Sequence, residues 1–244
     1  MRPAQYIKSG LGLMMLVWWT VALAPPVDAE AVGSPSSILK KGKWVMGLGG
    51  GAMGRHLKGV ADALVFQGGH FRGYGLTDWL SVYGKVGGAS LEVDDSTIVK
   101  LQDPSTQNSF GGNILFSVQA KGKLLEHKRW GWEWDWSAQY VDIRARHKGK
   151  NAARWHEWQL AMSTAKSMGR LKPYVGAKYS IVNMLFRVWD NGSLLKQGRY
   201  REDNPVGIFV GTDYYFGQYE DVILNIEGSY LDGPEIAMAL SYSF

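Results

Sequence analysis

Three acidic residues in this sequence could carry chemistry. Glu133 and Asp135 lie two positions apart, and Glu157 follows in a later segment. Carboxylates that converge can act as general acid and base, or bind a divalent cation. The alternative is a polar interior in which lysines neutralise the carboxylates, and we favour it because a narrow interior must balance its charges in any case. The residues assigned to this predicted polar network are Lys85, Glu133, Asp135, Glu157, Lys178, Asp213 and Glu227.

The five histidines do not complete a catalytic group with these carboxylates. His156 and Glu157 are adjacent, so on an ideal strand their side chains point to opposite faces and cannot orient each other. The sequence contains no cysteine, which excludes thiol nucleophiles, disulfides and cysteine-ligated zinc. We therefore expect no catalytic residue, no metal and no cofactor.

A basic run is the second candidate site. It contains Arg144, Arg146, Lys148 and Lys150 within seven positions of the chain. Arginine and lysine bind phosphate groups well, so the run could contact a phosphorylated partner. It could equally be a solvated loop, and both interpretations stay open.

Composition restricts the class of protein that carries these residues. The chain has 244 residues, of which 45% are hydrophobic and 20% charged, and this balance makes intrinsic disorder improbable. The formal net charge of +5 is small and spread along the chain, which argues against a nucleic-acid binder. The length allows one domain or two small ones.

The N-terminus has the layout of a secretory signal peptide. Arg2 and Lys8 precede an apolar run from Leu11 to Ala24, and small residues follow up to Ala29. The apolar run is shorter than the roughly 20 residues that a membrane-spanning helix needs. We expect export and cleavage after Ala29, and hence a signal peptide over residues 1–29.

The remaining chain alternates between apolar and polar residues with the period of a β-strand. Four tryptophans, for example, occupy every second position from Trp130 to Trp136. The pattern predicts about ten strands, with eight as the fallback, in a single barrel over residues 43–244 that follows a short segment, 30–42. The predicted strands are 43–53, 61–74, 79–92, 109–121, 129–141, 154–166, 172–185, 205–216, 221–230 and 235–244. Long and short connections alternate between them, which favours an all-β, antiparallel, up-and-down barrel.

The large side chains indicate which face of the barrel contacts water. The tryptophans from Trp130 to Trp136, with Phe116, Trp158 and Tyr214, are too bulky for the interior of so small a barrel. Facing outward into lipid they need no cavity, and aromatic residues near strand ends can lie at the membrane interfaces. We therefore predict a transmembrane barrel rather than a soluble one.

Two segments resemble small outer-membrane β-barrel proteins of Gram-negative bacteria. One is Tyr74-Gly75-Leu76-Thr77-Asp78-Trp79, which is similar to a hairpin turn of these proteins. The other is the last strand, where Leu240, Tyr242 and Phe244 alternate up to a final aromatic residue. The resemblance implies a location in the outer membrane and recognition of the last strand by the barrel-assembly machinery. In that setting the basic run would face the phosphates of lipopolysaccharide.

The sequence favours a non-enzymatic role, in the structure of the membrane or in interactions through external loops. A narrow passive pore is the alternative, although clear aqueous channels occur at about 16–18 strands. A lipid-modifying enzyme or protease of the outer membrane is third. We expect a monomer, whereas an extracellular partner or a permeating solute cannot be named from the sequence.

Overall fold

The computed structural model describes residues 38–58, 61–95, 109–147, 151–190, 193–217 and 221–244. These residues form eleven strands in one antiparallel sheet. The strands are β1 (Trp44–Leu57), β2 (Ala61–Thr77), β3 (Leu80–Asp95), β4 (Ser109–His127), β5 (Trp132–His147), β6 (Asn151–Lys166), β7 (Leu171–Asp190), β8 (Ser193–Arg201), β9 (Val206–Phe216), β10 (Val222–Tyr230) and β11 (Glu235–Ser243). Within the described ranges, no helix is long and apolar enough to cross a membrane.

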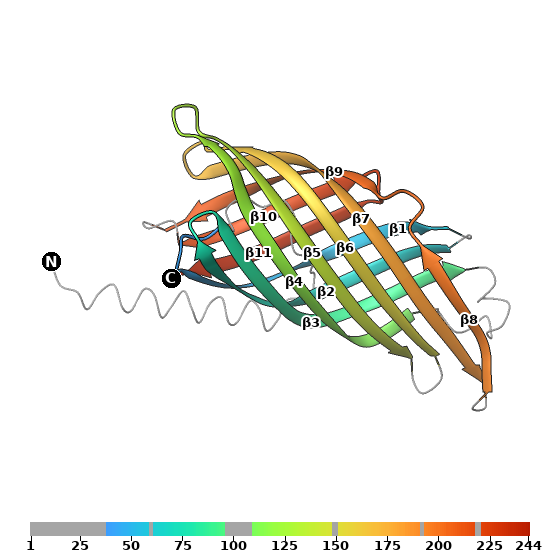
Figure 1. Ribbon diagram of the computed structural model, residues 1–244. Coiled ribbons are helices and arrows are strands. Elements are labelled where there is room, and N and C mark those ends of the chain that lie inside the picture. The colour runs from blue at the N-terminus through green and yellow to red at the C-terminus, as the bar shows by residue number, and fades with distance from the viewer. Residues whose placement is uncertain (1–37, 59–60, 96–108, 148–150, 191–192, 218–220) are drawn as a thin grey trace, which may run out of the picture.

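The sheet closes into a ten-strand barrel, which confirms the predicted fold class. Each strand from β1 to β7 pairs with the next, β7 then pairs with β9, and β11 returns to β1 (Figure 1). The remaining strand, β8, pairs with the far part of β7, from Asn183 to Asp190. The signal peptide predicted over residues 1–29 lies outside the described residues.

Several strands are longer than predicted. The sequence predicts a connection from 186 to 204, but β7 continues to Asp190 and β8 occupies Ser193–Arg201. This hairpin forms because its inward side chains pack: the rings of Phe186 and Tyr200 stack with centroids 5.3 Å apart. The predicted connection between β5 and β6 is shortened for the same reason, since Ile143, Ala145, Ala153 and Trp155 are buried on the inner face.

The difference in strand length divides the barrel into two parts. The strands β9, β10 and β11 have 11, 9 and 9 residues, whereas β4 and β7 have 19 and 20. We call the part that includes β9–β11 and the C-terminus the terminal half, and the part beyond it the distal half. In Figure 1 the C-terminus and β8 lie at opposite ends of the barrel.

The distal half is closed by contacts between β8 and β1. Leu57 and Glu202 form an isolated β-bridge. The Lys58 amide donates to the Arg201 carbonyl over 2.7 Å, and the Asp203 amide donates to the His56 carbonyl over 3.0 Å. The end of β8 thus takes the place next to β1 that β11 occupies in the terminal half.

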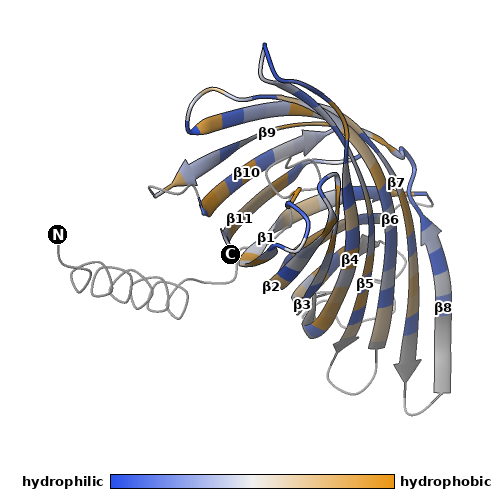
Figure 2. Cartoon of the chain, turned by 60° about the vertical axis from the view of Figure 1, so that its left-hand side comes forward, coloured by the Kyte–Doolittle hydropathy of each residue, from blue (hydrophilic) through white to orange (hydrophobic). Residues whose placement is uncertain are grey.

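The polarity of the two barrel faces inverts between the halves. In the terminal half of β5 the inward residues are Asp135, Ser137 and Gln139, while Trp132 and Trp134 are exposed outside. In the distal half of the same strand the inward residues Val141, Ile143 and Ala145 are apolar, while Arg144 is exposed outside. Figure 2 shows hydrophilic and hydrophobic residues alternating along these strands.

The same inversion occurs in the neighbouring strands. In β6 it lies between Trp158, exposed, and Trp155, buried. In β7 the exposed Val175, Tyr179 and Ile181 give way to the exposed Arg187, while the inward Lys178 and Ser180 are followed by Val182 and Met184. The change falls at residues that are paired across the strands, so it marks one boundary around this side of the barrel.

The segment before β1 lies across the terminal mouth. Leu39 is buried against Val45, Phe71 and Tyr83. Its amide donates to the Ser81 hydroxyl over 2.8 Å, which fixes the segment to β3. The mouth is therefore occupied by the chain itself.

Candidate functional site

The interior of the distal half is filled by an apolar core. Trp155 is fully buried at its centre, together with Leu91, Leu115, Ile143 and Met184. A core of this kind is typical of soluble proteins, since side chains there exclude water by close packing. The other members of the core are Met53, Leu57, Ala63, Val65, Ala89, Val93, Val141, Ala145, Ala153, Val182 and Phe186.

A buried ionic cluster lies directly beneath this core, and Arg55 is its centre. The Arg55 guanidinium lies 3.0 Å from Glu157 and 3.3 Å from Glu235. It also lies 3.6 Å from both Glu202 and Asp232. Because these carboxylates come from β6, β11, the β8–β9 connection and the β10–β11 turn, one side chain links β1 to four other places in the fold.

Lys178 is the second cation of the cluster. Its ammonium group donates to Glu235 and to the Ser229 hydroxyl, the latter over 2.9 Å, and lies 3.2 Å from Asp232. The Ser180 hydroxyl donates to Asp232 over 3.2 Å. The side chain of Asp232, in the β10–β11 turn, is thus held from both β1 and β7.

The cluster is connected to the apolar core. The indole of Trp155 donates to Glu157 over 3.1 Å. The four carboxylates outnumber the two cations, and burial raises the pKa of Asp232 although Arg55 and Lys178 oppose this shift. Buried ion pairs of this kind contribute little net stability when complete, but removal of one partner is costly because it leaves an unpaired charge. The arrangement is suited to locking the β10–β11 hairpin into the wall.

A further polar group fills the terminal half. The Tyr174 hydroxyl donates to Glu227 over 2.9 Å, and the Asn225 amide donates to Asp213 over 2.5 Å. Lys172 pairs with Glu133 over 2.7 Å. Apart from Glu133, which is half-buried, the side chains of this group are buried.

The structure places all seven residues of the predicted polar network on the inner face. Six of them are buried and Glu133 is half-buried. Some partners differ from the expected ones: Glu157 pairs with Arg55 rather than with a lysine, and Lys178 pairs with Asp232 and Glu235. Glu157 and Lys178 thus belong to the ionic cluster around Arg55.

The centre of the ionic cluster is missing from the sequence prediction. The sequence predicts a first strand that ends at residue 53, so Arg55 lies outside it, although Met53, Arg55 and Leu57 continue its alternation. No local pattern identifies Asp232, since it lies in a turn and is buried by strands distant in sequence.

The predicted basic loop is wrong in its placement. Arg144 and Arg146 belong to strand β5, and Arg144 is bonded to Asp142 over 3.3 Å on the outer face. The alternation that places Ile143 and Ala145 inside extends the strand through these residues. Lys148 and Lys150, like the side chain of Arg146, lie outside the described residues.

The last strand forms the seam of the barrel. Leu240 pairs with Leu48 of β1, and the Trp44 and Phe244 backbones exchange hydrogen bonds of 3.0 and 2.9 Å. Tyr242 and Phe244 are exposed on the outer face, with ring centroids 6.0 Å apart. Recognition of these residues by an assembly machinery stays a prediction.

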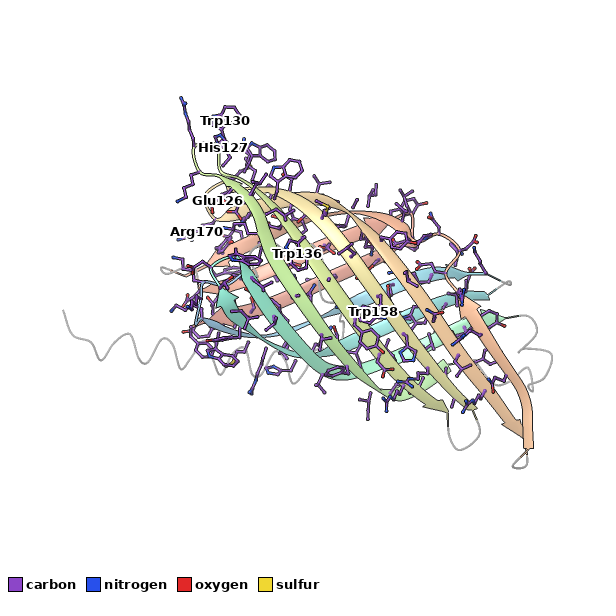
Figure 3. The ribbon with its side chains drawn as sticks, in the orientation of Figure 1. Glu126, His127, Trp130, Trp136, Trp158 and Arg170 are labelled. Carbon is purple, nitrogen blue, oxygen red and sulfur yellow. The ribbon has the colours of Figure 1, made fainter. Side chains whose placement is uncertain are left out.

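The outer face of the terminal half is rich in aromatic residues. Trp158 is exposed on β6, and Figure 3 shows it on the outer surface with Trp136 of β5. Trp130 lies with His127 at the projecting turn between β4 and β5, where the two rings stack at 4.8 Å. Among the described side chains there is no group of histidines and carboxylates suited to a metal ion.

Comparison with known proteins gives likenesses of fold. No family model and no curated protein sequence matches the chain. The outer-membrane protease OmpT from Escherichia coli is 12% identical, with 83% of this chain and 96% of that chain covered and a TM-score of 0.44. The β domain of the Bordetella autotransporter BrkA is 11% identical, covers 83% and 99%, and has a TM-score of 0.45. The translocator domain of the autotransporter NalP from Neisseria meningitidis is 10% identical, covers 85% and 90%, and has a TM-score of 0.42.

Proposed function

We propose that this chain is an outer-membrane barrel without a through-channel, which lies in the bilayer with its terminal half and acts at the cell surface through its distal half. The observation that carries the proposal is the inversion of polarity on both faces of β5, β6 and β7. A barrel wall whose outer face is apolar fits a lipid environment. A wall whose inner face is apolar and whose outer face is polar fits an aqueous environment. The point of inversion therefore marks the outer edge of the membrane.

Strand length supports this position. A transmembrane strand needs about 9–11 residues. The strands that occur only in the terminal half, β9, β10 and β11, have 11, 9 and 9 residues, so they span the bilayer and end at its edge. Both ends of the described chain, Ile38 and Phe244, then lie on the periplasmic side.

The filled interior supports a structural or surface-interaction role over a pore. The apolar core around Trp155 occupies the distal half, and the ionic cluster around Arg55 lies beneath it. An ion would have to cross both layers, and a charge in an apolar core is costly to desolvate. The role we assign is thus a rigid envelope protein whose outward surface meets lipopolysaccharide.

Planar-bilayer recording tests the absence of a channel. We expect no stable conductance steps from the refolded protein, with a 16-stranded porin as the positive control. Reproducible steps would instead support the narrow pore. Membrane location is tested separately: we expect fractionation with outer membranes and a heat-modifiable gel mobility, and recovery as a soluble periplasmic protein would contradict the proposal.

A further inference from the structure

We infer that the outward face of β5–β8, just beyond the membrane edge, binds the phosphate groups of an anionic glycolipid in the outer leaflet. This inference rests on the proposed function, which places that edge at the polarity inversion. The side chains concerned are five exposed arginines on four adjacent strands. We call them the arginine patch: Arg144, Arg154, Arg187, Arg199 and Arg201.

The strand register brings these arginines together. Arg144 of β5 is directly opposite Arg154 of β6. Arg154 is opposite Leu185 of β7, which in turn is opposite Arg199 of β8. Arg201 and Arg187 flank this row, opposite Asn183 and Gln197. These rows alternate with the buried core residues, so the arginines share the outer face.

The patch has a large excess of positive charge. Asp142 is the single carboxylate among the described outward side chains of these four strands, and it bonds to Arg144 and to Arg154 over 3.3 and 3.1 Å. Like charges directly opposite each other destabilise a strand pair. Five guanidiniums against one carboxylate therefore favour binding of an anion.

Among the described side chains, strands β2 and β3 carry carboxylates rather than arginines on the outer face of the distal half. On the outer face of β2 and β3, the exposed residues near the distal end include Asp62 and Glu92. Asp62 is paired with His56 over 2.5 Å. A general need for solubility would not separate arginines from carboxylates in this way, so the arginine patch is suited to a specific anionic partner.

The surface next to the patch indicates that the anion is a lipid. On the membrane side, the row that contains Arg201 is followed by an apolar row of Tyr140, Trp158 and Ile181, which lies two rows from Arg144 and Arg154. Two residues along a strand advance by about 7 Å, so the apolar row lies about 7 Å from the Arg201 row and about 13 Å from the row of Arg144 and Arg154, within the length of acyl chains attached to phosphates on these arginines. Guanidinium groups bind phosphate oxygens in a bidentate manner, and a phosphate monoester carries the higher charge that the patch can neutralise. A soluble phosphate compound would leave the apolar row unused.

Lipid binding to the full chain, refolded in a non-ionic detergent, tests the inference. The probe is diphosphorylated lipid A, measured by native mass spectrometry. We expect the triple variant Arg154→Gln/Arg199→Gln/Arg201→Gln to bind it about tenfold or more weakly, because three charge-assisted contacts are lost. The matched control, Lys43→Gln/Lys166→Gln/Arg170→Gln, removes three exposed cations at the terminal end and should bind within about twofold of the unchanged protein.

Comparison of ligands tests the headgroup. We expect phosphatidylglycerol, a phosphodiester lipid, to bind at least about tenfold more weakly than diphosphorylated lipid A, and inorganic phosphate not to compete at equal concentration. Equal binding of both lipids, competition by free phosphate, or equal losses in the two triple variants would overturn the inference. If the protein is heat-modifiable and gives any of these results, only the inference about the arginine patch is wrong. If it is soluble and lacks heat-modifiable mobility, the proposed function is wrong as well.

Discussion

The two halves of β5, β6 and β7 are built from one continuous alternation but face opposite environments. In the terminal half the tryptophans Trp134 and Trp158 are exposed and most of the buried inward residues are polar. In the distal half Trp155 is buried and Arg154 is exposed. Strand periodicity thus sets which residues share a face, while the solvent on each side decides which face is apolar.

Single replacements of Trp155 and Trp158, the two tryptophans of β6, should show the largest difference between the two halves. We expect Trp155→Ala to lower the free energy of unfolding by about 3–5 kcal/mol, because it leaves a cavity in a packed core. Trp158→Ala removes an exposed ring and should cost about 1 kcal/mol or less. Urea unfolding in lipid vesicles provides the comparison, and equal losses would show that the distal core is not packed.

Disruption of the ionic cluster at the boundary between the halves should give the next largest effect. Arg55→Met should lower the free energy of unfolding by about 3–5 kcal/mol, because Glu157, Glu235 and Asp232 lose their shared cation. The double variant Arg55→Met/Glu157→Gln should recover part of this loss in the same assay. A double variant as unstable as the sum of the two single ones would show that Glu157 and Arg55 are not coupled.

One substitution placed in each half locates the membrane edge. Leu160→Arg puts a charge on the lipid face of the terminal half and should cost about 2–4 kcal/mol. Ala152→Arg puts the same charge on the outer face of the distal half, where repulsion from the opposite Arg187 is the main penalty and we expect a cost of about 1 kcal/mol or less. Unfolding in vesicles gives both values, and a comparable cost at Ala152 would place the edge beyond it.

The smallest effect is expected at an exposed hydrogen-bonded pair of the distal end. His56 and Asp62 are about 70% exposed, with side-chain values of 72% and 68%, in contrast to the fully buried Arg55 and Glu157. We expect Asp62→Asn to change the free energy of unfolding by less than about 1 kcal/mol. A loss as large as that of Arg55→Met would mean that the two environments are alike.

Much of the terminal half could be predicted from residues close in sequence. The alternation around Trp134 and around Met238 predicts strands whose outward residues are exposed in the structure. The turn at Asp78 and Trp79 is present between β2 and β3. These features depend on local period and turn chemistry, so a single segment contains the information for each of them.

The distal half could not be predicted in the same way. Ser193–Arg201 shows weak alternation, and it becomes a strand because Tyr200 stacks on Phe186 and Arg201 meets the end of β1. The basic run around Arg144 predicts a solvent-exposed loop, whereas in the structure Arg144 lies on one face of strand β5. In both cases the strand forms because its inner side chains pack against neighbouring strands, and the local sequence does not reveal that packing.

The sequence by itself predicted an antiparallel barrel, because the period of two and the alternation of long and short connections both favour that fold. It also determined which residues share a face, including Glu157 and Lys178 on the inner one. Only the tertiary structure decided where polarity inverts, which carboxylates surround Arg55, and that five arginines meet on one outer surface. Those features depend on register between strands far apart in the chain, and no local pattern specifies that register.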